Sequence, residues 1–191
     1  MAKRIMKNKH KLFRLTQSNM QGFTLVEIII VVTVMAILAA IAIPNFISWV
    51  PNFRLKSAAR DLYSTMQKVR LEAVKRNADI GISFSTVVFP TEGGGYQVFV
   101  DDGAGGGIAG DAIQNGTEAR ILQTNMPDSC SLVSASFLGN PRSGYTGEGL
   151  PLGNRIGSVM LRNNQSRWYR ISLSNAGHVR LEISIDGVSW N

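Results

Sequence analysis

The chain has 191 residues, enough for one ordinary domain and an appendage. Its formal net charge of +7 does not indicate a basic surface, because six of its 20 Lys and Arg residues, and no acid, lie before residue 22. The remaining 14 basic residues stand against 13 acids, and the single cysteine, Cys130, excludes an intrachain disulfide.

The first predicted element is a membrane helix that follows this basic leader. Residues 28–43 are apolar except for Thr33, and a helix over residues 23–43 spans roughly the 30 Å hydrocarbon core of a bilayer. The leader should stay on the cytoplasmic side, which places the C-terminal bulk across the membrane. A cleaved signal peptide is the simplest alternative, but the apolar run is too long and no A-x-A site with a polar exit follows it.

Glu27 sets this segment apart from a plain anchor, since carboxylates inside a membrane are costly and usually functional. Gly22 followed by Phe23-Thr24-Leu25-Val26-Glu27 resembles the prepilin-peptidase site of type IV pilins and of the pseudopilins of type II secretion. The resemblance implies cleavage after Gly22, methylation of the new N-terminal Phe23, and removal of residues 1–22 as a leader peptide. Pro44 matches the proline found partway along the helix in this family.

The same resemblance implies a role for Glu27 in assembly. In the family, the helices pack into a filament core, where the N-terminal amine of each new subunit meets the glutamate of a neighbour. A lone carboxylate is penalised in a core of low dielectric constant, and pairing relieves the penalty. The implied partners are other minor pilins or pseudopilins, the major pilin, prepilin peptidase and the inner membrane, with the C-terminal domain in the periplasm.

Past Pro44 the helical pattern continues but becomes amphipathic. Apolar residues recur at steps of three and four at Leu55, Ala58, Ala59, Leu62, Met66, Val69 and Ala73. Pro44 and Pro51 each lack a backbone donor, which predicts a kink or a locally loosened helix between them. With Asn77 as its cap, one helix is predicted over residues 23–77, with the membrane half at 23–43.

After Asn77 the apolar residues alternate with period two, which predicts strands. The expected strands cover residues 80–84, 96–100, 119–123, 131–136, 158–162, 168–174 and 179–185. Gly93-Gly94-Gly95 and Asn175-Ala176-Gly177 are typical of hairpin turns. Residues 101–116 and 139–157 are expected to be long irregular loops. The prediction is an α+β, pilin-like fold in which an all-β domain over residues 78–191 packs as an antiparallel sheet against the helix.

This layout resembles the GspH/FimT-type minor pseudopilins and minor pilins. The resemblance rests on Val98-Phe99-Val100-Asp101, on the returning Glu118-Ala119-Arg120-Ile121-Leu122 and on Gly177-His178-Val179-Arg180. It implies a structural subunit of a type IV pilus that primes assembly or sits at the filament tip. A type II secretion pseudopilin is the alternative, and the N-terminal motif does not separate major from minor subunits.

Charge is segregated along the β-domain, which raises the alternative of DNA binding. Residues 79–118 hold six acids and no base, whereas residues 120–191 hold seven arginines and no lysine. Four of these arginines lie on or near the last strands, with Trp168 and Tyr169 between them: Arg162, Arg167, Arg170 and Arg180. Arginines beside aromatic residues suit phosphate contact and base stacking.

Some FimT-like proteins bind DNA in natural transformation through Gly-Arg-x-Arg, but here His178 replaces the first arginine. The simpler interpretation is that the four arginines pair with acids of neighbouring subunits or lie on a solvated sheet face.

Metal binding and catalysis find little support. Asp101, Asp102 and Asp111 are oxygen ligands that calcium accepts, but their spacing is not that of an EF-hand, and solvated loop aspartates are the simpler explanation. The glycine-rich residues 103–110 lack the Gly-Lys-Ser/Thr and helix of a nucleotide loop. His178 and Cys130 are the only His and Cys after the leader, and nothing indicates a catalytic pair. We therefore expect no enzymatic activity, no cofactor and no metal.

Overall fold

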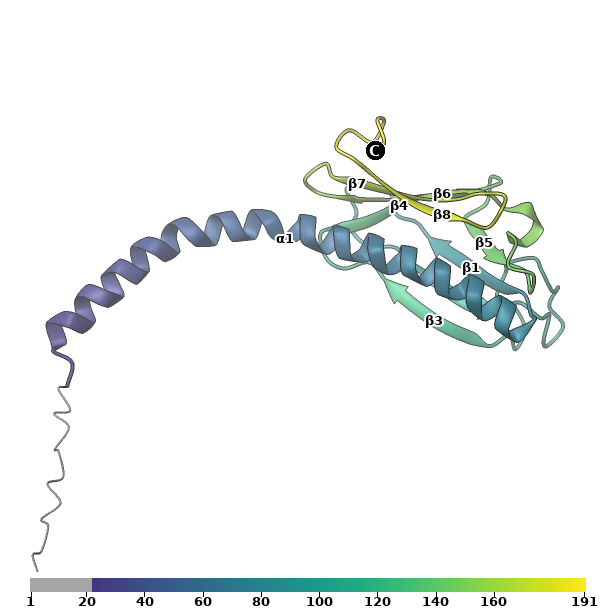
Figure 1. Ribbon diagram of the computed structural model, residues 1–191, viewed down its shortest axis with the longest axis horizontal. Coiled ribbons are helices and arrows are strands. Elements are labelled where there is room, and N and C mark those ends of the chain that lie inside the picture. Colours follow the sequence, from purple (N-terminus) through teal and green to yellow (C-terminus); the bar gives the residue numbers. More distant parts are fainter. Residues whose placement is uncertain (1–21) are drawn as a thin grey trace, which may run out of the picture. The chain divides into compact units, whose positions relative to one another are not determined.

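The computed structural model describes residues 22–191, so of the predicted leader only Gly22 falls within it. This part of the chain forms two compact units that divide between Ala42 and Ile43. Its elements, most of them labelled in Figure 1, are α1 (Leu25–Arg76), β1 (Ile80–Ser85), β2 (Gly95–Val100), β3 (Arg120–Asn125), β4 (Cys130–Phe137), β5 (Arg142–Tyr145), the 3₁₀ helix η1 (Leu152–Asn154), β6 (Gly157–Asn163), β7 (Trp168–Leu173) and β8 (Val179–Ser184).

The N-terminal half of α1 is apolar on every side. Its large aliphatic side chains up to Ile43 are exposed, and the helix is long and apolar enough to cross a membrane. The hydroxyl of Thr33, the one polar group among residues 28–43, donates a hydrogen bond of 2.8 Å to the Ile29 carbonyl. A helix that is apolar all round needs lipid or other helices as its surroundings, and the membrane segment predicted from the sequence has that character.

α1 continues through Pro44 and Pro51 without a break in its assignment. Near these prolines, two side chains also donate to the main chain. Ser48 Oγ donates to the Asn45 carbonyl at 2.7 Å, and Gln165 Nε2 donates to the Ser48 carbonyl at 2.7 Å. The carbonyls that lose a helical donor to Pro44 and Pro51 are those of Ala40 and Ile47, so these two bonds add to the helix and do not replace the missing ones.

The C-terminal half of α1 packs on the β-domain through the face that the sequence predicts. Its buried residues are Leu55, Ala58, Ala59, Leu62, Met66, Val69 and Ala73. The helix ends at Asn77, which adopts a positive φ of 49°. The Ala78 amide donates to the Ala73 carbonyl and the Asn77 amide to the Val74 carbonyl, each at 3.2 Å. These two bonds form a Schellman motif, so the predicted cap is confirmed.

The strands form two four-stranded antiparallel sheets, with the orders β3-β2-β1-β5 and β4-β6-β7-β8. One hydrophobic core joins both sheets and α1, and within it the rings of Phe84 and Phe137 stack with their centroids 5.3 Å apart. The predicted α+β class is confirmed, but the single sheet is replaced by two. β5 was missed because only one of its four residues, Tyr145, is large and apolar, which gives no alternation to detect.

Of the two predicted hairpin turns, the structure contains one and not the other. Asn175-Ala176-Gly177 does connect β7 and β8, with Gly177 at φ 74° and its amide donating to the Ser174 carbonyl. Gly93-Gly94-Gly95 is not a tight turn between β1 and β2, and that expectation was wrong. The connection instead crosses to the other sheet, where the amides of Val87 and Gly93 donate to the β4 carbonyls of Leu132 and Cys130 at 2.9 Å.

Candidate functional site

The residues of the predicted processing and assembly site lie just before α1, at Gly22 and Phe23, and in its first turn, at Glu27. Gly22 and Phe23 are exposed, and a Cβ added to Gly22 would meet no atom within 4 Å. Nothing in the described chain therefore requires glycine at this position. Glu27 lies in the first turn, where its amide donates to Thr24 Oγ1 at 3.2 Å.

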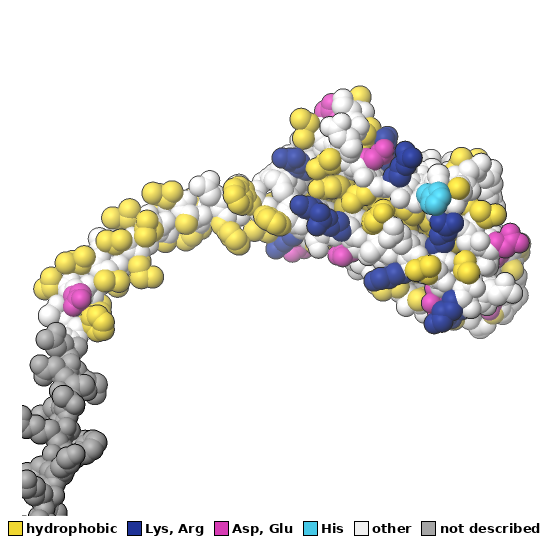
Figure 2. Space-filling view, in the orientation of Figure 1, with side chains coloured by type: hydrophobic (Ala, Val, Ile, Leu, Met, Phe, Trp, Pro, Cys, Tyr) yellow, Lys and Arg dark blue, Asp and Glu magenta, His cyan; other side chains and the backbone are white. Residues whose placement is uncertain are grey.

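Thr24 is thus the N-cap of α1, a role that the sequence reading missed. The signal was present, since Thr24-x-x-Glu27 has the spacing of a capping box. This cap keeps the Glu27 carboxylate beside the positive end of the helix dipole. Glu27 is the one charged residue between Phe23 and Phe53, and Figure 2 shows this half of α1 covered by hydrophobic side chains with an acidic one near its start.

Pro44 is one of the residues that line an open groove of about 660 Å³, together with Phe46, Ile47 and Gln165. Next to this groove, hydrogen bonds between amide side chains hold the β6–β7 turn against α1. Asn163, only 1% exposed, donates from Nδ2 to Asn52 Oδ1 at 2.8 Å, and Asn52 Nδ2 donates to Gln165 Oε1 at 2.9 Å. We call Asn52, Asn163 and Gln165 the amide clamp. It fixes the part of the β-domain that lies against the segment after Pro44.

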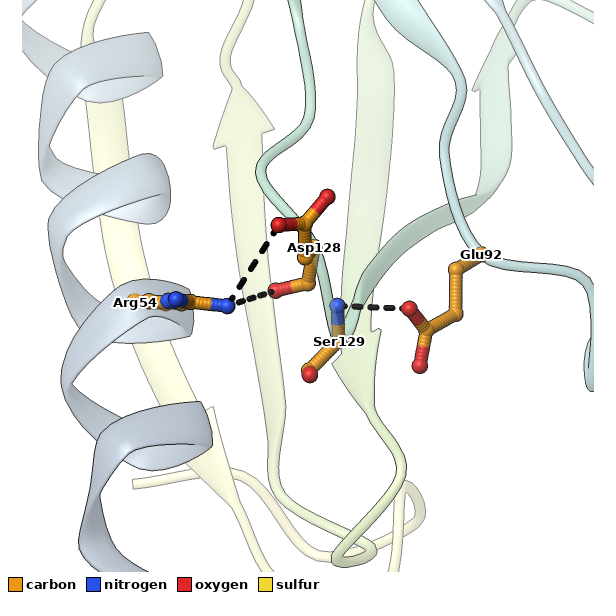
Figure 3. A network of polar contacts seen from close by, with 4 residues as sticks. All are labelled: Arg54, Glu92, Asp128 and Ser129. Carbon is orange, nitrogen blue, oxygen red and sulfur yellow. Dashed lines mark hydrogen bonds and ion pairs between the residues drawn. The ribbon is translucent and has the colours of Figure 1, made fainter. Parts of the chain in front are cut away.

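A second polar contact holds α1 to the loop between β3 and β4 (Figure 3). Arg54 Nη1 lies 3.5 Å from the Asp128 carbonyl and 3.7 Å from its carboxylate, while on the other side Glu92 accepts the Ser129 amide at 2.7 Å. Because Asp128 is largely exposed, the ion pair adds at most about 1 kcal/mol. Its effect is to position the loop where the chain passes from one sheet to the other.

The strand registers place Arg162 and Arg170 on the outer face of the sheet β4-β6-β7-β8. Arg162 stands opposite Trp168, and Arg170 opposite Glu182. The Arg162 guanidinium lies 3.7 Å from the Phe89 ring centroid and 4.8 Å from that of Trp168. Arg170 forms a 2.6 Å ion pair with Glu182 and lies over Trp190. Both cations are therefore engaged within the chain.

Arg167 and Arg180 are exposed but do not lie together. Arg167 precedes Trp168 at one end of β7, whereas Arg180 pairs with Ser172 near the other, about 17 Å away along the strand. His178 is exposed in the β7–β8 turn. The structure thus spreads the four predicted arginines over the sheet and does not gather them into one basic cluster.

Gly177, the first residue of the segment Gly177-His178-Val179-Arg180, has a packing role of its own. A Cβ there would lie 2.6 Å from the Gly149 carbonyl oxygen and 3.2 Å from Arg70 Cζ. Arg70 reaches from α1 to both loops, donating to the carbonyls of Gly149 at 2.9 Å and Ala176 at 3.0 Å. The glycine permits this close approach, an explanation that the sequence pattern could not supply.

All six acids of the acidic stretch accept backbone hydrogen bonds. They are Asp79, Glu92, Asp101, Asp102, Asp111 and Glu118. Asp101 and Glu118 are buried, and Asp101 receives the amides of Gly110 at 2.9 Å and Ala112 at 2.7 Å. Burial raises the pKa of the Asp101 carboxyl, more than these hydrogen bonds lower it. The expectation of solvated loop aspartates is therefore wrong for Asp101, which is buried and anchors the loop over residues 101–116 from within.

Within residues 22–191, no group of three or more His, Cys, Asp or Glu side chains is placed to hold a metal.

Comparisons with known proteins agree on the kind of molecule. A family profile described as "Type II transport protein GspH" matches residues 58–177, and one described as "Prokaryotic N-terminal methylation motif" matches residues 17–43. The chain is 30% identical over 169 residues to "Pilin-like protein PilA1" of Thermus thermophilus, covering 85% of this chain and 98% of that protein.

Two solved structures are also similar to this chain. The type IV minor pilin FimU of Pseudomonas aeruginosa is 18% identical, with a TM-score of 0.47 over 69% of this chain and 90% of its own. The minor pseudopilin EpsH of Vibrio cholerae is 13% identical, with a TM-score of 0.43 over 67% of this chain and 95% of its own.

Proposed function

Because the chain belongs to the GspH family of type IV pilin-like proteins, we propose that it is a pilus subunit that primes assembly or sits at the filament tip. Members of this family are structural subunits, and the chain is a minor pilin or pseudopilin. The observation that carries the finer proposal is the placement of Gly22, Phe23 and Glu27 at the start of a helix that is apolar on every side. Alignment with a pilin-like protein over almost its whole length supports a pilus subunit.

Maturation is the first step of this function. Prepilin peptidase cleaves after Gly22 and frees the amine of Phe23 for methylation. The exposure of Gly22, and the open space around it, support a glycine required by the peptidase and not by folding. The apolar half of α1 then anchors the subunit in the inner membrane, with the β-domain in the periplasm, as the basic leader favours.

Assembly is the second step, and Glu27 directs it. Packing the apolar half of α1 among neighbouring helices removes the Glu27 carboxylate from water, which costs several kcal/mol if the charge stays unpaired. The N-terminal amine of a neighbouring subunit relieves that cost when it lies beside Glu27. The Thr24 cap supports this role, because it fixes the backbone of Glu27 within the first turn.

A count of surface pili in a deletion strain tests the proposal. We expect pili to be lost on deletion, restored by the wild-type gene and by Glu72→Ala, and not restored by Glu27→Ala or Gly22→Val. Glu72 is a matched control, since it is a carboxylate on the domain half of the same helix and, among residues 22–191, forms its ion pair with the nearby Arg76. Mass spectrometry should find Glu27→Ala processed and Gly22→Val still carrying its leader. Normal piliation of the deletion strain would contradict a priming role.

A type II secretion pseudopilin is the second candidate, favoured by the description of the matching family profile. The same deletion strain separates the two. Loss of secreted folded proteins from the medium, with normal pili, would assign the chain to secretion.

DNA binding has narrower support, because only Arg167 and Arg180 of the four arginines lack an ion pair or an aromatic contact in residues 22–191. If DNA binding is real, it weakens steeply with salt and falls in Arg167→Gln and Arg180→Gln.

A further inference from the structure

The uncharged stretch at the start of the mature chain is longer than a hydrocarbon core. From Phe23 to Phe53 there are 31 residues, with Glu27 as the one charge. As a helix they extend about 46 Å, which matches the 40–45 Å of a bilayer with both headgroup layers. Phe46, Trp49 and Phe53 are exposed near its end, where aromatic residues mark the interface. The next cations, Arg54 and Lys56, follow this uncharged stretch directly, and their long side chains can extend back toward the headgroups of the far leaflet.

A pocket opens beside Phe53 and Lys56, between α1 and the sheet β4-β6-β7-β8. Its volume is about 260 Å³, and its lining residues are Asn52, Phe53, Lys56, Arg167, Tyr169 and Ile183. Two cations and an amide thus share one small pocket with apolar side chains, and no carboxylate lines it. Arg54 has a partner in Asp128, but neither Lys56 nor Arg167 takes part in an ion pair among residues 22–191.

The amide clamp holds this pocket in place before any ligand arrives. Asn163 Oδ1 accepts the backbone amides of Gln165 at 3.1 Å and Arg167 at 2.9 Å. Asn163 is itself bonded to Asn52 on α1. The backbone of Arg167 is therefore fixed relative to Lys56, one helical turn beyond Asn52. Figure 2 shows basic side chains beginning where the hydrophobic covering of α1 ends.

We propose that this pocket binds the headgroup of an anionic phospholipid in the far leaflet of the membrane. Lys56 and Arg167 contact the phosphate, as cations do at an anionic membrane surface, while Phe53 and Tyr169 lie against the glycerol and the upper acyl chain. The proposal rests on the membrane anchoring given under the proposed function. The bound lipid holds the β-domain at a fixed depth and rotation before the subunit leaves the bilayer.

Hydrogen–deuterium exchange of the full-length protein in lipid nanodiscs tests this site. The discs contain phosphatidylcholine with or without phosphatidylglycerol, and the readout is exchange of the amides at residues 164–167. We expect phosphatidylglycerol to slow this exchange in the wild type. Lys56→Gln and Arg167→Gln should each lower the affinity for phosphatidylglycerol by about fivefold, so that more of this lipid is needed for the same slowing. Arg180→Gln, which removes an exposed arginine at the other end of the sheet, should leave the slowing unchanged.

Three results would overturn the proposal: equal exchange in both lipids, a full phosphatidylglycerol effect in Lys56→Gln and Arg167→Gln, or equal slowing by soluble glycerol phosphate in phosphatidylcholine discs. The last result would assign the pocket to a soluble phosphate ester. A chain that inserts in the discs without a lipid preference contradicts this inference alone. A chain that does not insert contradicts the proposed membrane anchor as well.

Discussion

The two halves of α1 belong to one continuous helix but are built for different surroundings. Before Ile43, every large apolar side chain is exposed, whereas after Arg54 seven residues on one face are buried in the domain core. The first half begins at the Thr24 cap and presents its apolar side chains to its surroundings. The second is fastened by its core face, the amide clamp and Arg70. Domain stability and filament assembly can therefore be changed separately.

The largest separation is expected from one leucine in each half. Leu62→Ala, at a fully buried position, should lower the free energy of unfolding of the β-domain by about 2–5 kcal/mol. Leu38→Ala, at an exposed position before Ile43, should leave that free energy unchanged. Urea titration of the full chain in detergent measures both free energies. A comparable decrease in the two variants would contradict the difference between the two halves of α1.

The thiol of Cys130 provides a probe for that titration. It is fully buried, and burial raises its pKa to about 11, so the native protein presents neither an accessible thiol nor a thiolate at neutral pH. Its labelling rate should rise with urea as the domain unfolds, and more steeply in Leu62→Ala. Rapid labelling of the native wild type would contradict this burial.

The amide clamp should have a smaller effect on stability. Asn163→Ala removes the acceptor for two backbone amides and the donor to Asn52, which should cost about 1–3 kcal/mol. Asn164→Ala is the matched control, because Asn164 is the exposed next residue in the same turn. Thermal unfolding of both variants decides the matter, and equal melting temperatures would show that the clamp contributes nothing.

The smallest effect concerns the anchored loop and its pH dependence. Because burial raises the pKa of Asp101, the folded state holds this proton more tightly than the unfolded state. The Asp101 contribution to stability therefore falls as the pH rises from the unfolded pKa of about 3.9 through the raised folded value, and is constant above it. The difference in unfolding free energy between wild type and Asp101→Asn should follow this course. A difference independent of pH would contradict it.

Regular periodicity made most of the fold predictable. The seven buried residues of α1 were correctly predicted, because apolar residues spaced three and four apart form a local pattern. The cap at Asn77 was also correctly predicted, because an Asn at the end of a helical pattern is a local signal as well. β5 and the division into two sheets were not, since a four-residue strand has too few positions to show a period, and strand pairing is set by tertiary packing.

The candidate sites differ in the same way, because some are made of neighbouring residues in the sequence and others of residues that only the fold brings together. The motif around Gly22, Phe23 and Glu27 is contiguous and could be found in the sequence. By contrast, Lys56 and Arg167 line one pocket although they are more than a hundred residues apart in the sequence, and no local sequence pattern predicts that they come together. The acidic stretch misled for a related reason, because sequence shows the charge of Asp101 but not the loop amides that it accepts.

The central claim is that the Glu27 charge drives entry of the subunit into a filament. Its most direct test is the ratio of protein in sheared filaments to protein in the inner membrane for wild type, Glu27→Gln and Glu27→Ala. Because Gln keeps the shape of Glu and removes only its charge, we expect both variants to reach the membrane, to be processed and to be lost from filaments to the same extent. Normal incorporation of Glu27→Gln would contradict the account.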